Sequence, residues 1–137
     1  MELSEQIREK GLKATPSRLS VISVLGSNHE AYAHADLEAI FTDIDRVTLY
    51  RVLNDFEEVG LVHKIIDTAG ITRFAICSHN CPGKHHTDSH VHFNCQCCNK
   101  MFCLENVQAP SVKMPAGFKV AGLNTVIYGM CKNCNAA

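Results

Sequence analysis

Apolar residues in the first 60 positions recur every three or four residues, which is the spacing of helices that bury one face. Residues 2–10 are polar and mixed in charge, so they predict a short exposed helix. Thr15 and Pro16 form a favourable helix start, and the apolar spacing then continues to about Gly26. Residues 34–41 predict a third short helix. The first part of the chain is therefore expected to be helical.

A fourth helix is expected to begin after Asp45, whose side chain can accept a hydrogen bond from the first turn, and to end at Gly60. Its core-facing stripe consists of Leu49, Val52, Leu53 and Phe56. The pattern then changes to two β-prone runs, 61–66 and 71–76, on either side of the turn sequence 67–70. Helices followed by a hairpin are the order of a winged helix-turn-helix domain.

The second part of the chain predicts strands. Residues 77–89 form a polar linker, and 90–94, 100–104 and 118–128 are β-prone. Two prolines between the last two runs leave room for a short helix at most. We therefore expect an α+β protein with two domains. Residues 1–84 form the winged helix, with a hinge at about 77–89, and 85–137 form a small α/β domain.

All eight cysteines lie between Cys77 and Cys134. The chain has no run of about 18 apolar residues and no apolar signal region at its start, so it is expected to be cytoplasmic and outside the membrane. Cysteines in that compartment favour metal ligation over disulfides.

Two CxxC pairs supply the strongest chemical signal in the sequence. Each pair points two sulfur atoms at one position, and two pairs complete the closed thiolate set that structural zinc prefers. The expected ligands are Cys95, Cys98, Cys131 and Cys134. The additional Cys97 leaves the pairing in the first motif open, although CxxC geometry favours Cys95 with Cys98.

A second metal-binding pattern is His90-Val91-His92, since alternation along a strand places both imidazoles on one face. The spacing alone does not choose the remaining ligands. The candidates are Cys77, His79, Cys81, His85, His86, Asp88 and Cys103.

The outward face of the fourth helix predicts DNA contacts. With the apolar stripe turned to the core, Arg46, Tyr50, Arg51 and Asn54 face outward, and such side chains suit a major groove. Lys64 and Arg73 on the hairpin could contact phosphates. The net charge of −1 does not favour a nucleic-acid partner, so this hypothesis depends on the arrangement of residues.

Taken together, these motifs resemble the ferric uptake regulator family. The matching segments are 11–18, 46–53, 90–92 and the two CxxC pairs, in the family's order. The resemblance implies a homodimeric, metal-dependent repressor that binds a double-stranded DNA operator. It assigns Lys13 to the minor groove, Arg18 to a position near phosphate, and Thr48, Tyr50 and Arg51 to the recognition helix.

This chain departs from the family's iron and peroxide sensors at three positions, and these departures indicate which metal the regulatory site binds. The resemblance places Ala31, Ala75 and Cys103 where those sensors have a histidine and two carboxylates. The remaining positions resemble the zinc-uptake-regulator branch, whose sensor ligands match His63, Cys77, His90 and His92. A thiolate with three imidazoles favours Zn²⁺ over Fe²⁺ at this regulatory site. An iron- or peroxide-sensing member of the family remains the alternative.

Two functions of other classes are alternatives to this hypothesis. A zinc hydrolase or deaminase would need a general base beside the metal, and no glutamate lies near His90 or His92 in sequence, so we expect no enzyme. A zinc-ribbon protein that buffers metal or binds a partner, without a DNA role, is the second alternative. The acidic N-terminal half favours it, and the recognition-helix motif opposes it.

Overall fold

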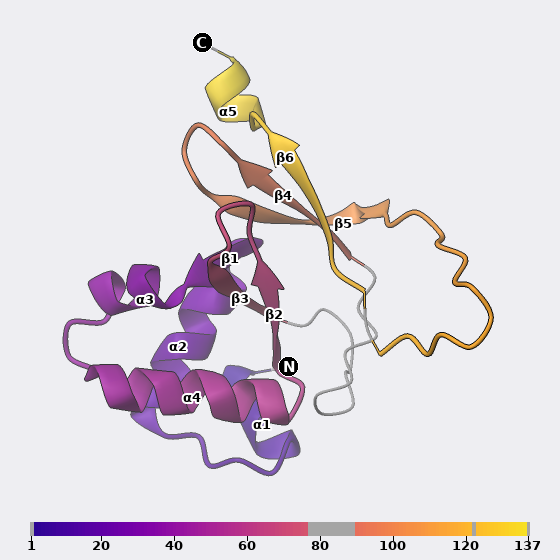
Figure 1. The fold of residues 1–137 in the computed structure, drawn as a ribbon. Helices are drawn as coiled ribbons and strands as arrows, with labels where there is room; N and C mark the ends of the chain where they lie inside the picture. The colour runs from indigo at the N-terminus through magenta and orange to yellow at the C-terminus, as the bar shows by residue number, and fades with distance from the viewer. Residues whose placement is uncertain (1, 77–89, 122, 137) are drawn as a thin grey trace.

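The computed structural model describes residues 2–76, 90–121 and 123–136. The helices are α1 (Leu3–Glu9), α2 (Pro16–Ser27), α3 (His34–Ile40), α4 (Arg46–Glu58) and α5 (Lys132–Asn135). The strands are β1 (Glu30–Ala33), β2 (Val62–Ile66), β3 (Thr72–Ile76), β4 (His90–Cys95), β5 (Met101–Gln108) and β6 (Thr125–Gly129). Helices α1–α4 gather at one end of the molecule, and β4–β6 with α5 lie at the other (Figure 1).

The two strongest predicted helix starts are confirmed. The Thr15 side chain accepts a hydrogen bond from the Arg18 amide, and Pro16 occupies the first turn of α2. The Asp45 side chain accepts from the Thr48 amide at the start of α4. Each cap satisfies a backbone donor that the helix itself leaves unpaired.

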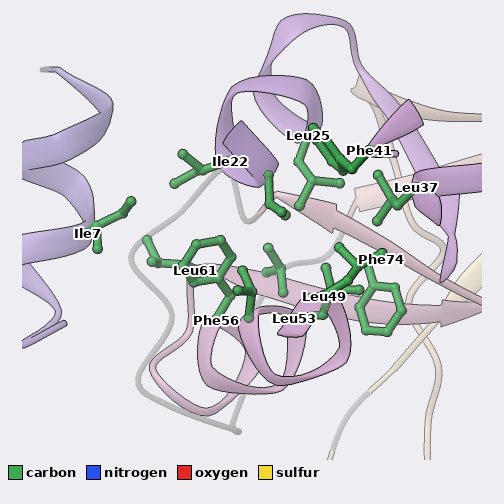
Figure 2. Close-up of a cluster of buried hydrophobic side chains, with 13 residues drawn as sticks. Ile7, Ile22, Leu25, Leu37, Phe41, Leu49, Leu53, Phe56, Leu61 and Phe74 are labelled. Carbon is green, nitrogen blue, oxygen red and sulfur yellow. The ribbon is translucent and has the colours of Figure 1, made fainter. Parts of the chain in front are cut away.

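The N-terminal elements enclose one hydrophobic core (Figure 2). Its buried members are Ile7, Val21, Ile22, Leu25, Leu37, Phe41, Leu49, Val52, Leu53, Phe56, Leu61, Val62 and Phe74. The whole predicted stripe of α4 is among them. Because complete burial of one such side chain contributes about 1.5–3 kcal/mol, this cluster is the main source of stability for the helical end.

A single sheet with the strand order β2-β3-β1-β5-β4-β6 connects the two ends of the molecule. Strand β1 lies in the middle: Tyr32 pairs with Phe74 of β3, and Ala31 pairs with Met101 of β5. Beside it, a second small cluster of buried residues contains Ala31, Ile65, Ala75 and Met101. The sequence did not predict β1, because four residues directly before a helix are too few to establish an alternating pattern.

The prediction of a strand over 118–128 was wrong for its first part. Strand β6 begins only at Thr125, where it pairs with Val91 in a parallel arrangement with β4. Among the residues that the structure describes, the pairing with β4 begins at Val91 and Thr125. The segment between β5 and β6 instead loops away from the sheet (Figure 1). The short helix α5 was also not predicted, since one turn leaves no periodic signal.

Among the described helices, we find no candidate that combines the length and apolar character needed to cross a membrane.

Candidate metal centres and candidate DNA-contacting helix

The four cysteines of the two CxxC pairs converge at one position near the C-terminus. Their sulfur atoms all lie within 4.8 Å of one another, and we call them the four-cysteine cluster. The Sγ atoms of Cys95 and Cys134 are 3.7 Å apart, and those of Cys98 and Cys131 are 4.0 Å apart. Four sulfurs at about 2.3 Å from a tetrahedral zinc ion would be separated by about 3.8 Å. The observed cluster therefore has the dimensions of a zinc site.

Backbone geometry builds this cluster. The end of β4 supplies Cys95, and the tight turn after it, which we call the knuckle (Cys95–Cys98), brings Cys98 back to it. Asn99 follows the knuckle with a φ of 63°, a left-handed conformation that asparagine tolerates better than most residues. Cys131 and Cys134 come from the start and the single turn of α5, directly after β6. The parallel pairing of β4 with β6 thus brings the two CxxC motifs together.

The cysteine side chains differ in acidity. The backbone amides of Cys98 and Cys131 both donate to the Cys95 sulfur at 3.4 Å, and they lower the pKa of this thiol to about 6. Hydrogen bonding with the thiols of Cys131 and then Cys97 raises the pKa of Cys134. A metal that binds all four as thiolates must therefore displace protons.

A second site joins the two ends of the molecule. His63 lies on β2 and His92 on β4, and their Nε2 atoms are 3.2 Å apart. Both side chains are buried, and the ring centroids are 5.3 Å apart. We call these two residues the histidine pair. Two imidazole nitrogens that bind one tetrahedral ion at about 2.0–2.1 Å are separated by about 3.3 Å. The rings are therefore close enough to share a hydrogen bond or to bind one ion together.

Neighbouring strands place a small residue or a further cysteine opposite each member of the histidine pair. Ala75 lies directly opposite His63 in the β2–β3 pairing, and Cys103 lies opposite His92 in the β4–β5 pairing. The small Ala75 is fully buried and supplies no ligand. His90 begins β4, but its side chain and the whole of Cys77 lie outside the described residues. The structure thus brings together two of the four predicted regulatory ligands.

The predicted DNA-reading side chains lie on the exposed face of α4. Arg46 and Tyr50 are mostly exposed, and Arg51 is exposed as well. Helix α3 supports this face, because Glu38 forms an ion pair with Arg46 at 3.1 Å and the His34 ring lies 5.9 Å from the Tyr50 ring.

Other predicted DNA contacts are held differently. The Thr48 hydroxyl donates to the Asp45 carboxylate, so it helps to hold the side chain that caps α4. Lys13 is exposed on the segment before α2. The Arg18 guanidinium donates to the Lys13 carbonyl at 2.9 Å and forms an ion pair with Asp55 of α4 at 3.1 Å. Arg18 therefore joins the segment before α2 to α4.

The expectation that Arg73 could contact phosphate was wrong. Its side chain is 9% exposed and forms an ion pair with the buried Asp67 at 2.9 Å. Sequence reasoning missed this pair, although a charged residue within an otherwise buried strand is a signal that a partner is needed. Lys64 is also paired, with Glu57 at 3.4 Å.

Comparisons with known proteins agree with this arrangement. The model of the ferric uptake regulator family matches residues 9–128. The ferric uptake regulation protein of Legionella pneumophila is 32% identical over 143 residues, which cover 98% of this chain and 99% of the relative. The peroxide-responsive repressor of Staphylococcus aureus (strain Mu50 / ATCC 700699) is 29% identical and covers 97% of this chain and 91% of the relative.

A solved structure of a zinc uptake regulator in complex with zinc and DNA shares the fold. Its TM-score is 0.63 at 20% identity, and the alignment covers 96% of this chain and 89% of that one. Both the family match and the Legionella relative span nearly the whole chain. The chain therefore belongs to the ferric uptake regulator family, whose members are metal-responsive transcription regulators.

Proposed function

We propose that this chain is a homodimeric repressor that senses zinc through a regulatory site formed by His63, Cys77, His90 and His92. The observation that carries the proposal is the buried histidine pair, with Nε2 atoms 3.2 Å apart. One histidine comes from the hairpin that follows the DNA-facing helix, and the other from the C-terminal sheet. When bound, a zinc ion would supply a further link between these two parts of the chain.

The donor set supports zinc over iron. Neutral imidazole and thiolate are ligands that zinc takes readily, whereas the buried Ala31 and Ala75 supply none of the side-chain donors that the iron and peroxide sensors have at these positions. The four-cysteine cluster, with sulfur separations of 3.7 and 4.0 Å, would hold a second zinc ion with a structural role. The zinc uptake regulator that shares this fold is a further point of support.

The chain's own residues account for DNA binding. The capped start of α4 holds Arg46, Tyr50 and Arg51 on an exposed face, where they can meet base edges and phosphates. We assign residues 1–84 to the DNA-binding domain, with a hinge at about 77–89, and residues 85–137 to the dimerisation domain.

Exposed apolar residues of the C-terminal part support a homodimer, because patches of this kind on a single chain mark interaction surfaces. They are Val107, Val112, Met114, Phe118, Val120, Leu123, Ile127, Tyr128 and Met130.

A metal-dependence experiment tests the proposal. Binding to DNA from the promoter of the gene that encodes this chain is measured by fluorescence anisotropy, with zinc, ferrous iron or manganese added to the chelator-treated protein. We expect zinc to raise DNA affinity, and His63→Ala and Cys77→Ser to remove most of that increase. Ile66→Ala is the matched control, since Ile66 lies on the same strand β2 and its side chain is exposed.

Unchanged zinc dependence in Cys77→Ser would refute the regulatory site. An increase in DNA affinity with ferrous iron alone would favour the second candidate, an iron or peroxide sensor. The 32% identical ferric uptake regulation protein and the 29% identical peroxide-responsive repressor support this candidate. No DNA binding under any condition would favour a metal-buffering protein. Arg51→Ala should weaken DNA binding by about 1–3 kcal/mol if the α4 face reads DNA.

A further inference from the structure

Apart from the histidine pair, the β2–β3 hairpin makes a second contact with β4 and the turn that follows β4. We call strands β2 and β3 with the turn 67–70 the wing. The turn is shaped by Asp67, whose Oδ1 atom accepts from the amides of Ala69 and Ile71 at 2.9 Å each. Gly70 completes it with a φ of 83°. These bonds give the turn one defined shape, and it packs against the segment that carries the knuckle.

Both residues that flank the knuckle bind the wing. Asn94 comes directly before Cys95, and its side-chain oxygen accepts from the Thr68 hydroxyl at 2.7 Å and from the Thr68 amide at 3.2 Å. Asn99 comes directly after Cys98, and its carbonyl accepts from Arg73 Nη2 at 2.6 Å.

Three of the contacting residues, Asp67, Arg73 and Asn94, are buried, whereas Thr68 and Asn99 lie at the exposed edge of the contact. Asn94 is 4% exposed, and its amide nitrogen also donates to the Lys100 carbonyl at 3.4 Å. Arg73 and Asp67 are both buried and bind each other at 2.9 Å. Since polar groups at such sites lose water on burial, they hold the wing in the orientation that satisfies them.

Arg73 extends the same connection to the shared strand. Its Nη1 atom donates to the Ala31 carbonyl of β1 at 3.4 Å, while its Nε atom donates to Asp67. One guanidinium therefore ties the wing turn, β1 and the knuckle together, and its planar shape suits several fixed acceptors at once.

We propose that the four-cysteine cluster positions the wing, through a polar clamp between the wing and the two asparagines that flank the knuckle. The clamp consists of Asp67, Thr68, Arg73, Asn94 and Asn99. A metal bound by Cys95 and Cys98 fixes the backbone on which Asn94 and Asn99 are presented, so the cluster acts on the DNA-binding part as well as on its own domain. The relevance to DNA rests on the proposed function, but the clamp itself does not.

Hydrogen exchange measured by NMR, on zinc-loaded protein without DNA, tests the clamp. Thr68→Val keeps the branched shape and removes the hydroxyl that binds Asn94, and Thr72→Val is the matched control on the exposed side of the same hairpin. We expect amide exchange at residues 68–71 to become roughly two- to tenfold faster in Thr68→Val, as for the loss of one partly buried hydrogen bond. Thr72→Val and the amides of α4 should remain as in the wild type.

Removal of the metal with a strong chelator provides the second arm. In the His63→Ala background, where the histidine pair no longer binds zinc, chelation should speed exchange in the wing turn. In Thr68→Val with His63→Ala the further increase should be smaller, because one connection is already lost.

Unchanged wing-turn exchange after chelation, or equal effects of Thr68→Val and Thr72→Val, would overturn the clamp. This experiment contains no DNA, so its failure would refute the clamp and not the proposed function. A failure of DNA binding would refute the proposed function and not the clamp.

Discussion

The helical end and the C-terminal part, which contains β4–β6 and α5, are stabilised in different ways. The helical end has thirteen buried hydrophobic residues in one cluster, drawn from four helices, the wing and two connecting positions, Phe41 and Leu61. Among the described residues, the second small cluster contains one buried residue from the C-terminal part, Met101, and many large apolar side chains of that part stay exposed. The four-cysteine cluster lies in this weaker part. Hydrophobic burial therefore stabilises the helical end, whereas the C-terminal part would gain the stability that its own core does not supply from the proposed metal and the proposed partner subunit.

Loss of the metal should have the largest effect, because it should destabilise the C-terminal part and leave the helical end folded. Cys131→Ser takes a buried sulfur out of the cluster, so zinc resistant to a mild chelator should fall from about one ion per chain to near zero. The β4–β6 pairing should then lose its order, while most helical circular dichroism remains, because α1–α4 have their own core.

Cys97→Ser is the control for this experiment, since Cys97 is exposed and outside the four-cysteine cluster. Retention of tightly bound zinc in Cys131→Ser, or its loss in Cys97→Ser, would show that the ligand set is assigned wrongly.

A cavity in the helical core should have the next largest effect. Leu53→Ala removes a fully buried side chain of α4 and is expected to lower the free energy of unfolding by about 2–5 kcal/mol. Val47→Ala, on the exposed face of the same helix, should change it by less than about 0.5 kcal/mol. Urea denaturation followed by circular dichroism measures both. Similar losses in the two variants would mean that this core does not dominate the stability of the helical end.

Acid should weaken the junction between the two ends by a smaller amount. Burial alone would raise the pKa of Asp67, but hydrogen bonds from Arg73 and from the Ile71 and Ala69 amides outweigh it and hold the pKa below its ordinary value. A lowered folded-state pKa stabilises the protein above the unfolded-state pKa. That contribution is lost as pH falls through the folded-state value, below about pH 4.

Thermal unfolding between about pH 5 and pH 2 measures this effect. Asp67→Asn should be less stable than the wild type at neutral pH and should lose less stability on acidification. Asp43→Asn, at an exposed position before α4, is the control. Parallel pH curves for the wild type and Asp67→Asn would contradict the assignment.

Much of the helical end and of the four-cysteine cluster could be predicted from the sequence. The stripe of Leu49, Val52, Leu53 and Phe56 fixed the orientation of α4, because one helix has only one way to bury four residues spaced in this manner. The two CxxC motifs predicted their own cluster, since sulfur atoms three residues apart already point at one position. These signals are local, or repeat in a way that a single element enforces.

The connection between the two ends was decided only by the tertiary structure. The sequence placed His63 and His92 in one site through family resemblance alone, and the 3.2 Å between them depends on pairings made by several strands. Strand β1, the buried Arg73 and the roles of Asn94 and Asn99 left no periodic or spacing signal. Each depends on a residue distant in sequence, and a pattern along one chain does not specify which distant groups will satisfy a buried charge or an unpaired backbone.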